Sequence, residues 1–178
     1  MNVQEVYAEL LRTRAAIGGL DPPAAPGVYA WFMRCDGRLG PFDVASDTPI
    51  YIGRTMDLAE RALRNHFKSG STGWSTLRRT LGAIMKDELA LVAIPRSPSR
   101  SESNLRHYRF DPVGEAALTA WMRSNLDTGV CATSDPEKAE QELLAWVVPM
   151  LNLQDCQNPC ARSIREMRKR CIDEASAG

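Results

Sequence analysis

The chain lacks an excess of either charge. Its 178 residues include 22 Lys and Arg and 22 Asp and Glu, so the formal net charge is zero. Nucleic-acid-binding proteins usually carry a surplus of Lys and Arg, and the charge of the whole chain gives no reason to expect that partner. Any basic surface must therefore be local. The stretch from Arg54 to Arg109 is such a region, because it carries eleven Lys and Arg residues against five Asp and Glu residues.

Long apolar runs are also missing. No segment approaches the ~20 apolar residues that span a bilayer, and residues 1–17 mix charged with apolar side chains, unlike a signal peptide. We therefore expect a cytoplasmic protein with no membrane partner. The five cysteines, an odd number, fit reduced thiols better than a disulfide framework. Cys156 and Cys160 are the one close pair, and zinc would need two further ligands.

The length predicts one domain over residues 1–178, because domains usually contain ~100–200 residues. Apolar residues at helical spacing predict a helix at 4–17, and a basic, solvated helical tail is expected at 161–175. Between them we expect a core at about 26–153 that contains a helical insertion at about 73–127. The sequence gives no indication of the oligomeric state.

Short runs of β-branched and aromatic residues predict three core strands, at Val28–Met33, Ile50–Gly53 and Val130–Thr133. A long hairpin connection would join the first two. Asp135 as cap and Pro136 at the first helical position predict a helix after the third strand. The expected fold is therefore α/β (α+β): a small three-stranded, mostly antiparallel sheet flanked by helices, with the insertion as a further helical layer.

Within the insertion the patterns are less regular. We expect a helix around Leu77–Met85, a strand at Leu89–Ile94, a loop at Pro95–Asn104 and a helix from Pro112 to Leu126.

Two tripeptides fall on the first two predicted strands, Gly27-Val28-Tyr29 and Tyr51-Ile52-Gly53. They resemble the two short signatures that name the GIY-YIG nuclease superfamily. Arg54 directly follows the second signature, Arg61 lies on the helix after it, and the run from Glu140 to Asn152 resembles the family's metal-binding helix with its closing Asn. Each motif alone is weak, but their joint order and spacing make the resemblance specific.

The resemblance implies a metal-dependent endonuclease that hydrolyses DNA phosphodiester bonds. This chemistry needs an activated water and neutralisation of the charge that develops on the phosphate. The family's single Glu corresponds to Glu140, which would bind Mg²⁺ or Mn²⁺; Mg²⁺ often uses one or two carboxylates together with waters and substrate oxygens. The Arg61 guanidinium would bind phosphate oxygens and stabilise the transition state. No small-molecule cofactor is expected.

The same resemblance assigns Tyr29 to activation of the water and Tyr51 to positioning of the water or the scissile phosphate. A phenol has a pKa near ~10, so a Tyr base needs a nearby cation, which Arg54 is placed to supply. Gly53 would allow the backbone to approach the substrate closely.

Other residues are candidates for support or for binding the nucleic acid. Asn152 closes the family pattern, whereas His66 lies one position beyond the family's usual His, a rotation of ~100° around the helix. The local positive excess suggests that the insertion binds the DNA backbone. The candidates for nucleic-acid binding are Arg64, Lys68, Arg78 and Arg79. The ordinary alternative is that these charges form a solvated helix face.

Two other functions stay open at this point. The chain could be a non-catalytic nucleic-acid-binding module that keeps the fold, although the intact Tyr, Arg and Glu positions count against this. It could also be a nuclease directed at RNA, and the sequence contains no recognisable stacking module that would decide between RNA and DNA.

Overall fold

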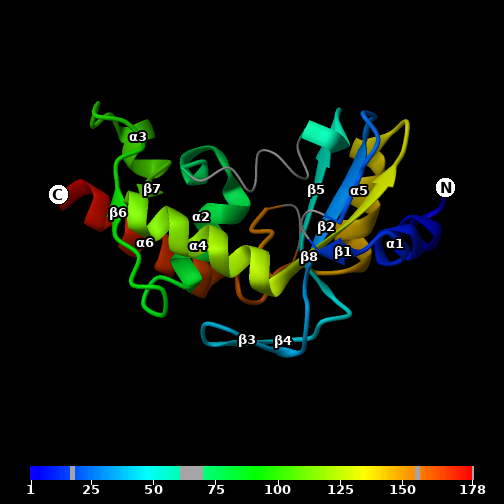
Figure 1. The fold of residues 1–178 in the computed structure, drawn as a ribbon, viewed down its shortest axis with the longest axis horizontal. Helices are drawn as coiled ribbons and strands as arrows, with labels where there is room; N and C mark the ends of the chain where they lie inside the picture. The colour runs from blue at the N-terminus through cyan, green and yellow to red at the C-terminus, as the bar shows by residue number, and fades with distance from the viewer. Residues whose placement is uncertain (17–18, 61–69, 155–156, 178) are drawn as a thin grey trace.

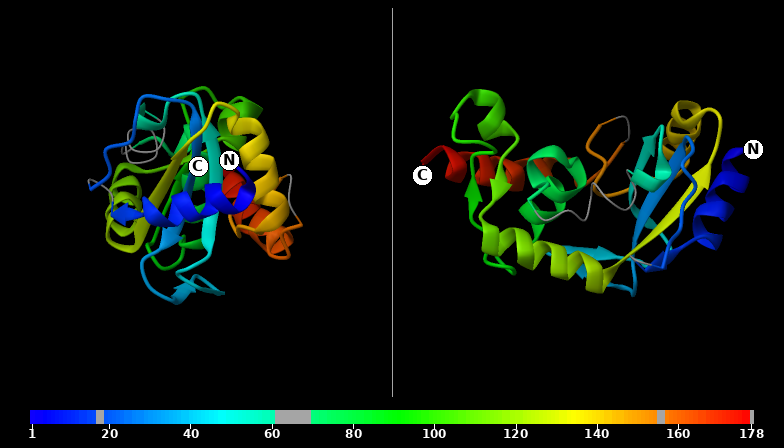
Figure 2. Two further views of the ribbon diagram at one scale, coloured as in Figure 1. Left: turned by 90° about the vertical axis from the view of Figure 1, so that its right-hand side faces the viewer. Right: turned by 45° about the horizontal axis from the view of Figure 1, so that its top comes forward.

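The computed structural model describes residues 1–16, 19–60, 70–154 and 157–177. The ribbon has two parts, a sheet covered by α1 (Val3–Arg12) and α5 (Pro136–Trp146), and a group of helices at the other end (Figure 1). The long helix α4 (Pro112–Asn125) runs from the helical part directly into a strand of the sheet (Figure 2). None of the helices in the described residues combines the length and apolarity needed to cross a membrane.

The sheet has four antiparallel strands in the order β1-β8-β2-β5. These strands are β1 (Ala15–Ala16), β2 (Gly27–Met33), β5 (Pro49–Thr55) and β8 (Leu126–Ala132). The three longer strands confirm the expected antiparallel sheet and, with the flanking helices, the expected fold class. The helix expected at 4–17 is wrong at its C-terminal end. It stops at Arg12, and Thr13 Oγ1 then accepts a hydrogen bond from Val130 N (2.9 Å), so the chain continues as β1 along β8.

The central strand β2 is buried along its whole length because both faces of the sheet are covered. Side chains alternate between the faces of a strand. Val28, Ala30 and Phe32 share one core cluster with α1 and α5, whereas Tyr29 and Trp31 belong to a second cluster that includes the helical part. Cover on both faces explains why this strand reads as a continuous apolar run.

Residues between β2 and β5 confirm the long hairpin connection. They form a separate two-stranded ribbon of β3 (Gly37–Leu39) and β4 (Phe42–Val44), which projects below the sheet in Figure 1.

The helical part contains η2 (Thr72–Trp74), α2 (Thr76–Ile84), β6 (Ala93–Ile94), α3 (Glu102–Arg106), β7 (Arg109–Phe110) and α4. The helices α2 and α4 confirm two predictions. The strand expected at Leu89–Ile94 is wrong except for its last two residues, which pair with β7. The loop expected at Pro95–Asn104 is also wrong in part, because the Ser101 side chain accepts from Asn104 N and caps α3.

The C-terminal helix α6 (Ala161–Ala177) packs against α2 and β6, so the expectation of a solvated tail is wrong. Its buried residues Ile164, Cys171 and Ala175 are at most 1% exposed. Their spacing of seven and four places them on one face of the helix. The basic residues of this helix are half-buried or exposed and lie on the remaining faces.

A buried ion pair joins α2 to α4. Arg78 Nη2 lies 2.7 Å from Glu115 Oε2, and the two side chains are 0% and 2% exposed. Glu115 also accepts from Thr72 Oγ1 (2.9 Å) and from Phe110 N (3.2 Å), while Arg78 Nη2 donates to Thr119 Oγ1 (3.0 Å). Each charge therefore has the additional hydrogen bonds that a buried pair requires.

Candidate functional site

Two tyrosines lie side by side on neighbouring strands. Tyr29 of β2 pairs with Gly53 of β5, and Tyr51 lies two residues before Gly53, so both phenols project from the same face of the sheet. Their ring centroids are 6.3 Å apart. Tyr29 is 2% exposed, and Tyr51 is half-buried at the edge of the sheet. The register of the β2–β5 pair therefore brings the two predicted phenols together.

Gly53 makes room for the phenol of Tyr29. A Cβ at this position would lie 2.6 Å from Tyr29 Oη and 2.7 Å from Tyr29 Cζ, closer than any side chain tolerates. The space over the glycine is thus filled by protein. Packing of Tyr29 is thus a reason for the glycine that the sequence did not predict, and the approach of the Gly53 backbone to a substrate stays a prediction.

Arg54 bridges two carboxylates of α5. Its Nη1 lies 2.8 Å from Glu137 Oε1, and its Nε lies 3.2 Å from Glu140 Oε2. Residues three apart face the same side of a helix, so both acids reach across to β5. The charge of Arg54 therefore faces two carboxylates of α5.

Asn152 completes the exposed edge of β5. Its Oδ1 accepts from Ile52 N (2.9 Å) and its Nδ2 donates to Ile52 O (2.9 Å), which copies the pairing of a neighbouring strand. One residue earlier, Leu151 N donates to Ile50 O (2.8 Å). These bonds fix the backbone on either side of Tyr51, so Asn152 is placed to support the site by holding β5.

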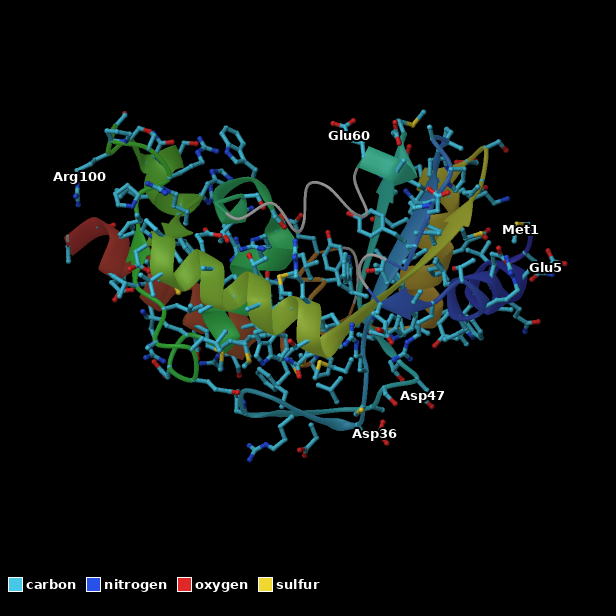
Figure 3. The ribbon with its side chains drawn as sticks, in the orientation of Figure 1. Met1, Glu5, Asp36, Asp47, Glu60 and Arg100 are labelled. Atoms are coloured by element: carbon cyan, nitrogen blue, oxygen red, sulfur yellow. The ribbon has the colours of Figure 1, made fainter. Side chains whose placement is uncertain are left out.

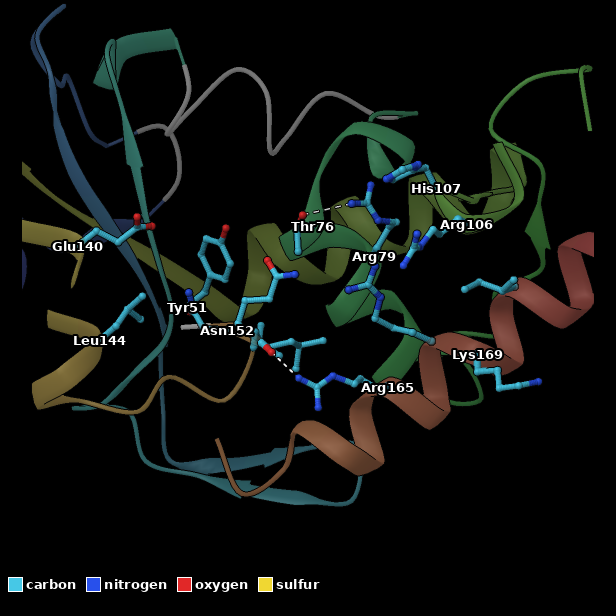
Figure 4. Close-up of a pocket in the computed structure, with 15 residues that line it drawn as sticks. Tyr51, Thr76, Arg79, Arg106, His107, Glu140, Leu144, Asn152, Arg165 and Lys169 are labelled. Atoms are coloured by element: carbon cyan, nitrogen blue, oxygen red, sulfur yellow. Dashed lines mark hydrogen bonds between the residues drawn. The ribbon is translucent and has the colours of Figure 1, made fainter. Parts of the chain in front are cut away.

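A cleft of about 630 Å³ opens beside these residues. Figure 4 shows Tyr51 and Glu140 on one side, Asn152 in the middle, and Arg79 with Arg165 on the other side. The opposite wall is formed by α2, α3 and α6. The cationic side chains among its described lining residues are Arg79, Arg106, Arg165, Arg168 and Lys169. The cleft therefore has a carboxylate and a phenol on one wall and a cluster of cations on the other.

Arg79 is the most buried of these cations, at 6% exposure. Burial, together with the neighbouring cations Arg168 and Arg96, lowers its pKa to about 10, while Tyr108 and Tyr51 act in the opposite direction. Arg79 lies near enough to Tyr51 for their charges to interact, which links the two walls of the cleft.

The structure removes Arg78 from the candidates for nucleic-acid binding. Its buried pair with Glu115 leaves no surface for a phosphate, so that assignment is wrong. Arg61, Arg64, His66 and Lys68 lie outside the described residues.

The other arginines of the insertion scatter over the surface. Arg96 stacks on the exposed Trp74, with its guanidinium carbon 4.3 Å from the ring centroid. Arg100 lies at the far end of the helical part, where it donates to Ala175 O (Figure 3). Among these, Arg106 reaches the cleft.

The donor set of the cleft suits a hydrated, oxygen-seeking cation. The described residues contain no group of three or more His, Cys, Asp or Glu side chains that could hold a metal. Glu140, whose side chain is 22% exposed, supplies one carboxylate at the cleft. Mg²⁺ accepts so few protein ligands because it keeps waters and takes oxygens from the substrate. Cys160 is a free thiol, and its sequence neighbour Cys156 is outside the described residues.

Several residues of the cleft were missed by sequence reasoning. Arg165 and Arg168 belonged to a tail that was expected to be solvated. Glu137, which pairs with Arg54 next to the cleft, carried no motif. A signal for α6 did exist, because the spacing of Ile164, Cys171 and Ala175 defines an apolar stripe. That stripe predicts packing, and packing turns the basic face of the helix toward the cleft.

Searches of curated proteins and of solved structures found no significant match to the chain. A family model does match. The model of the GIY-YIG catalytic domain covers residues 27–172, which include both tyrosines, Arg54, Glu140 and Asn152. Because this match spans most of the chain and falls on the strands and the helix that form the cleft, the chain belongs to the GIY-YIG family.

Proposed function

We propose that this chain is a metal-dependent endonuclease that hydrolyses DNA phosphodiester bonds in the cleft beside Tyr51 and Glu140. Its family is a family of nucleases, which supports a nucleic-acid substrate. The observation that carries the proposal is the shared cleft: Tyr51 of β5 and Glu140 of α5 line it together, with Tyr29 packed beside Tyr51. Hydrolysis needs such groups near one phosphate, and the proximity of these three residues from distant parts of the chain supports the proposal.

Glu140 would hold the Mg²⁺ or Mn²⁺ ion. The bound ion supplies positive charge that polarises the phosphate and offsets the charge developing on its oxygens. Arg54 Nε contacts Glu140 Oε2 and would keep this carboxylate turned toward β5. Arg54 Nη1 of the same guanidinium pairs with Glu137. Arg54 is therefore a positioning residue in this mechanism.

The two phenols would have different roles in the reaction. Tyr51 borders the cleft and would orient the water or the scissile phosphate through its Oη. Tyr29 Oη, ionised to the phenolate beforehand, would accept the proton of the attacking water and become a neutral phenol. A phenol with an ordinary pKa near ~10 is a poor base at neutral pH, so this role depends on nearby positive charge. Arg61 keeps its predicted role as the phosphate ligand.

A plasmid-nicking assay tests the proposal. Purified wild-type protein should nick supercoiled DNA with Mg²⁺ or Mn²⁺ and should fail to do so with EDTA. We expect Glu140→Gln to lose at least about 100-fold in rate, because loss of a residue that only supports a metal ligand already costs about 10–100-fold. Tyr29→Phe and Tyr51→Phe keep the packing and remove the hydroxyl, so each should also be slower. Glu142→Gln, on the same helix and paired with Lys138, is the matched control and should cleave normally.

Three results would overturn the proposal. Undiminished cleavage by Glu140→Gln would place the activity elsewhere. Wild-type protein that binds DNA but never cuts it would be a binding module with the fold of a nuclease. A labelled RNA that is cleaved under conditions where DNA stays intact would identify an RNA-directed enzyme.

A further inference from the structure

Two adjacent arginines of α2 have opposite electrostatic surroundings. Arg78 is fully buried and is neutralised by Glu115 at 2.7 Å. Arg79 is also more than nine-tenths buried, yet it forms no ion pair with any carboxylate in the described residues. A buried cation is costly unless an anion compensates it. The contrast suggests that the counter-ion of Arg79 is a ligand and is not supplied by the described part of the chain.

The hydrogen bonds of Arg79 leave donors unused. Its Nη1 donates to Thr72 O (3.2 Å) and Gly73 O (2.8 Å), and its Nη2 donates to Thr76 Oγ1 (3.2 Å). Its Nε finds no hydrogen-bond partner in the described part of the chain. The bonds to η2 and Thr76 hold the guanidinium at the wall of the cleft, and they do not neutralise its charge.

Further cations converge on the same wall. Arg168 of α6 is half-buried and Arg106 of α3 is exposed, and both line the cleft with Arg79. Within the described residues neither forms an ion pair with Asp or Glu. Glu140 is the acid among the described lining residues; it lies across the cleft and is held by Arg54. Cations gathered in this way repel one another, and an anion placed among them relieves that repulsion.

We propose that Arg79, Arg106 and Arg168 form an anion subsite that binds a phosphate of the substrate strand next to the phosphate being cleaved. This inference rests on the proposed function and adds the path of the strand, which would run from Glu140 across the cleft to α2 and α6. A volume of about 630 Å³ exceeds the needs of a single phosphate and is typical of sites for larger ligands. Guanidinium groups bind phosphate oxygens with paired hydrogen bonds, which suits this wall.

Binding measurements without catalysis test the subsite. A fluorescent DNA duplex is titrated against the Glu140→Gln protein in EDTA, at several salt concentrations. Adding Arg168→Gln should raise Kd about tenfold and reduce the slope of log K against log[salt] by about 0.9. The matched control is Arg162→Gln on the outer face of α6, where the side chain is 92% exposed and paired with Glu166, and it should change neither quantity. Arg79→Lys keeps the charge without the paired donors and should also weaken binding, while thermal unfolding verifies that it folds.

Calorimetry with inorganic phosphate tests whether the subsite binds a phosphate of a DNA strand or a free phosphate ion. If Arg168→Gln weakens phosphate binding but leaves duplex binding and its salt slope unchanged, the subsite serves a free anion and the proposal is overturned. Unchanged binding of both probes overturns it as well. If duplex binding depends on Arg168 but the wild-type protein never cleaves DNA, the binding of a strand phosphate at this subsite is upheld, and the nuclease assignment, with the position next to a cleaved phosphate, fails.

Discussion

Replacing Gly53 with alanine tests the packing of the two phenols. The added Cβ would lie 2.6 Å from Tyr29 Oη, 2.7 Å from Tyr29 Cζ and 3.0 Å from Tyr51 Cε1. The optimal separation of non-bonded carbon atoms is about 3.5–4.0 Å, so one or both rings must move by up to about 1 Å. Tyr29 is only 2% exposed and cannot simply swing into solvent.

The size of the effect follows from this crowding. Overpacking a well-filled site costs about 1–3 kcal/mol. In a chain of this size, each 1 kcal/mol changes Tm by about 2–4 °C, so Gly53→Ala should melt about 2–12 °C lower. A displacement of about 1 Å at a reacting group can reduce the rate about 100-fold. We therefore expect the loss of cleavage to exceed what the loss of stability explains.

Two measurements check this prediction. Circular dichroism gives Tm, and plasmid nicking gives the rate at a temperature where both proteins are folded. Gly37→Ala is the control, because a Cβ at that glycine would meet nothing within 4 Å. If Gly53→Ala melts and cleaves like the wild type, the phenol of Tyr29 does not occupy the space over Gly53, and the proposed arrangement of the two phenols is wrong.

Three further predictions concern stability and the metal. Glu115→Gln should cost about 3–5 kcal/mol by leaving Arg78 buried without its anion, and Tm should fall by about 6–20 °C in a thermal melt. Burial raises the pKa of Glu174, but hydrogen bonds from Lys86 and Ala93 N outweigh it and the pKa is lowered. The resulting stability is present above the ordinary Glu pKa of about 4.3 and fades as the pH falls through the lowered value; Glu174→Gln should thus lower Tm at pH 7, and the difference in Tm from the wild type should shrink as the pH is lowered below that range. EDTA should abolish nicking and leave Tm nearly unchanged, because a single carboxylate couples metal binding only weakly to folding; a large drop in Tm would indicate a structural metal instead.

Local signals in the sequence predicted the elements that carry the tyrosines and the glutamate. The residues of β2 and β5 form short runs whose composition favours a strand. The helix α5 begins after its cap Asp135, whose side chain accepts a hydrogen bond from Lys138 N. Such signals depend on a few neighbouring residues, so they can be recognised without knowledge of the fold. They also fix which side chains share a face, because the periodicities of strands and helices are constant.

The roles of Arg78 and Arg79 could not be separated in this way. One step along a helix rotates a side chain by ~100°, so the two must differ in environment, but the sequence does not say which one turns inward to a partner. That partner, Glu115, lies on α4, and the pairing exists only after α2 and α4 have packed. Pairings between distant residues of this kind decide whether a charged side chain stabilises the fold or is available to a ligand. Counting the Lys and Arg residues of a segment does not reveal these pairings.

The placement of the ion pairs also explains how a chain with zero net charge can present a positive cleft. Strongly exposed basic residues of α6 have acids nearby: Arg162 pairs with Glu166, Arg170 with Asp87, and Lys169, which also lines the cleft, with Asp173. Arg168, which faces the cleft, has no such acid among the described residues. The carboxylates of the chain therefore neutralise positive charges at exposed positions, where solvent already screens them. The positive charge of Arg168 in the cleft is left without an acid among the described residues, and electrostatic fields are strongest in such clefts. A neutral total limits non-specific attraction between the rest of the surface and nucleic acid, so the attraction that remains is directed at the cleft.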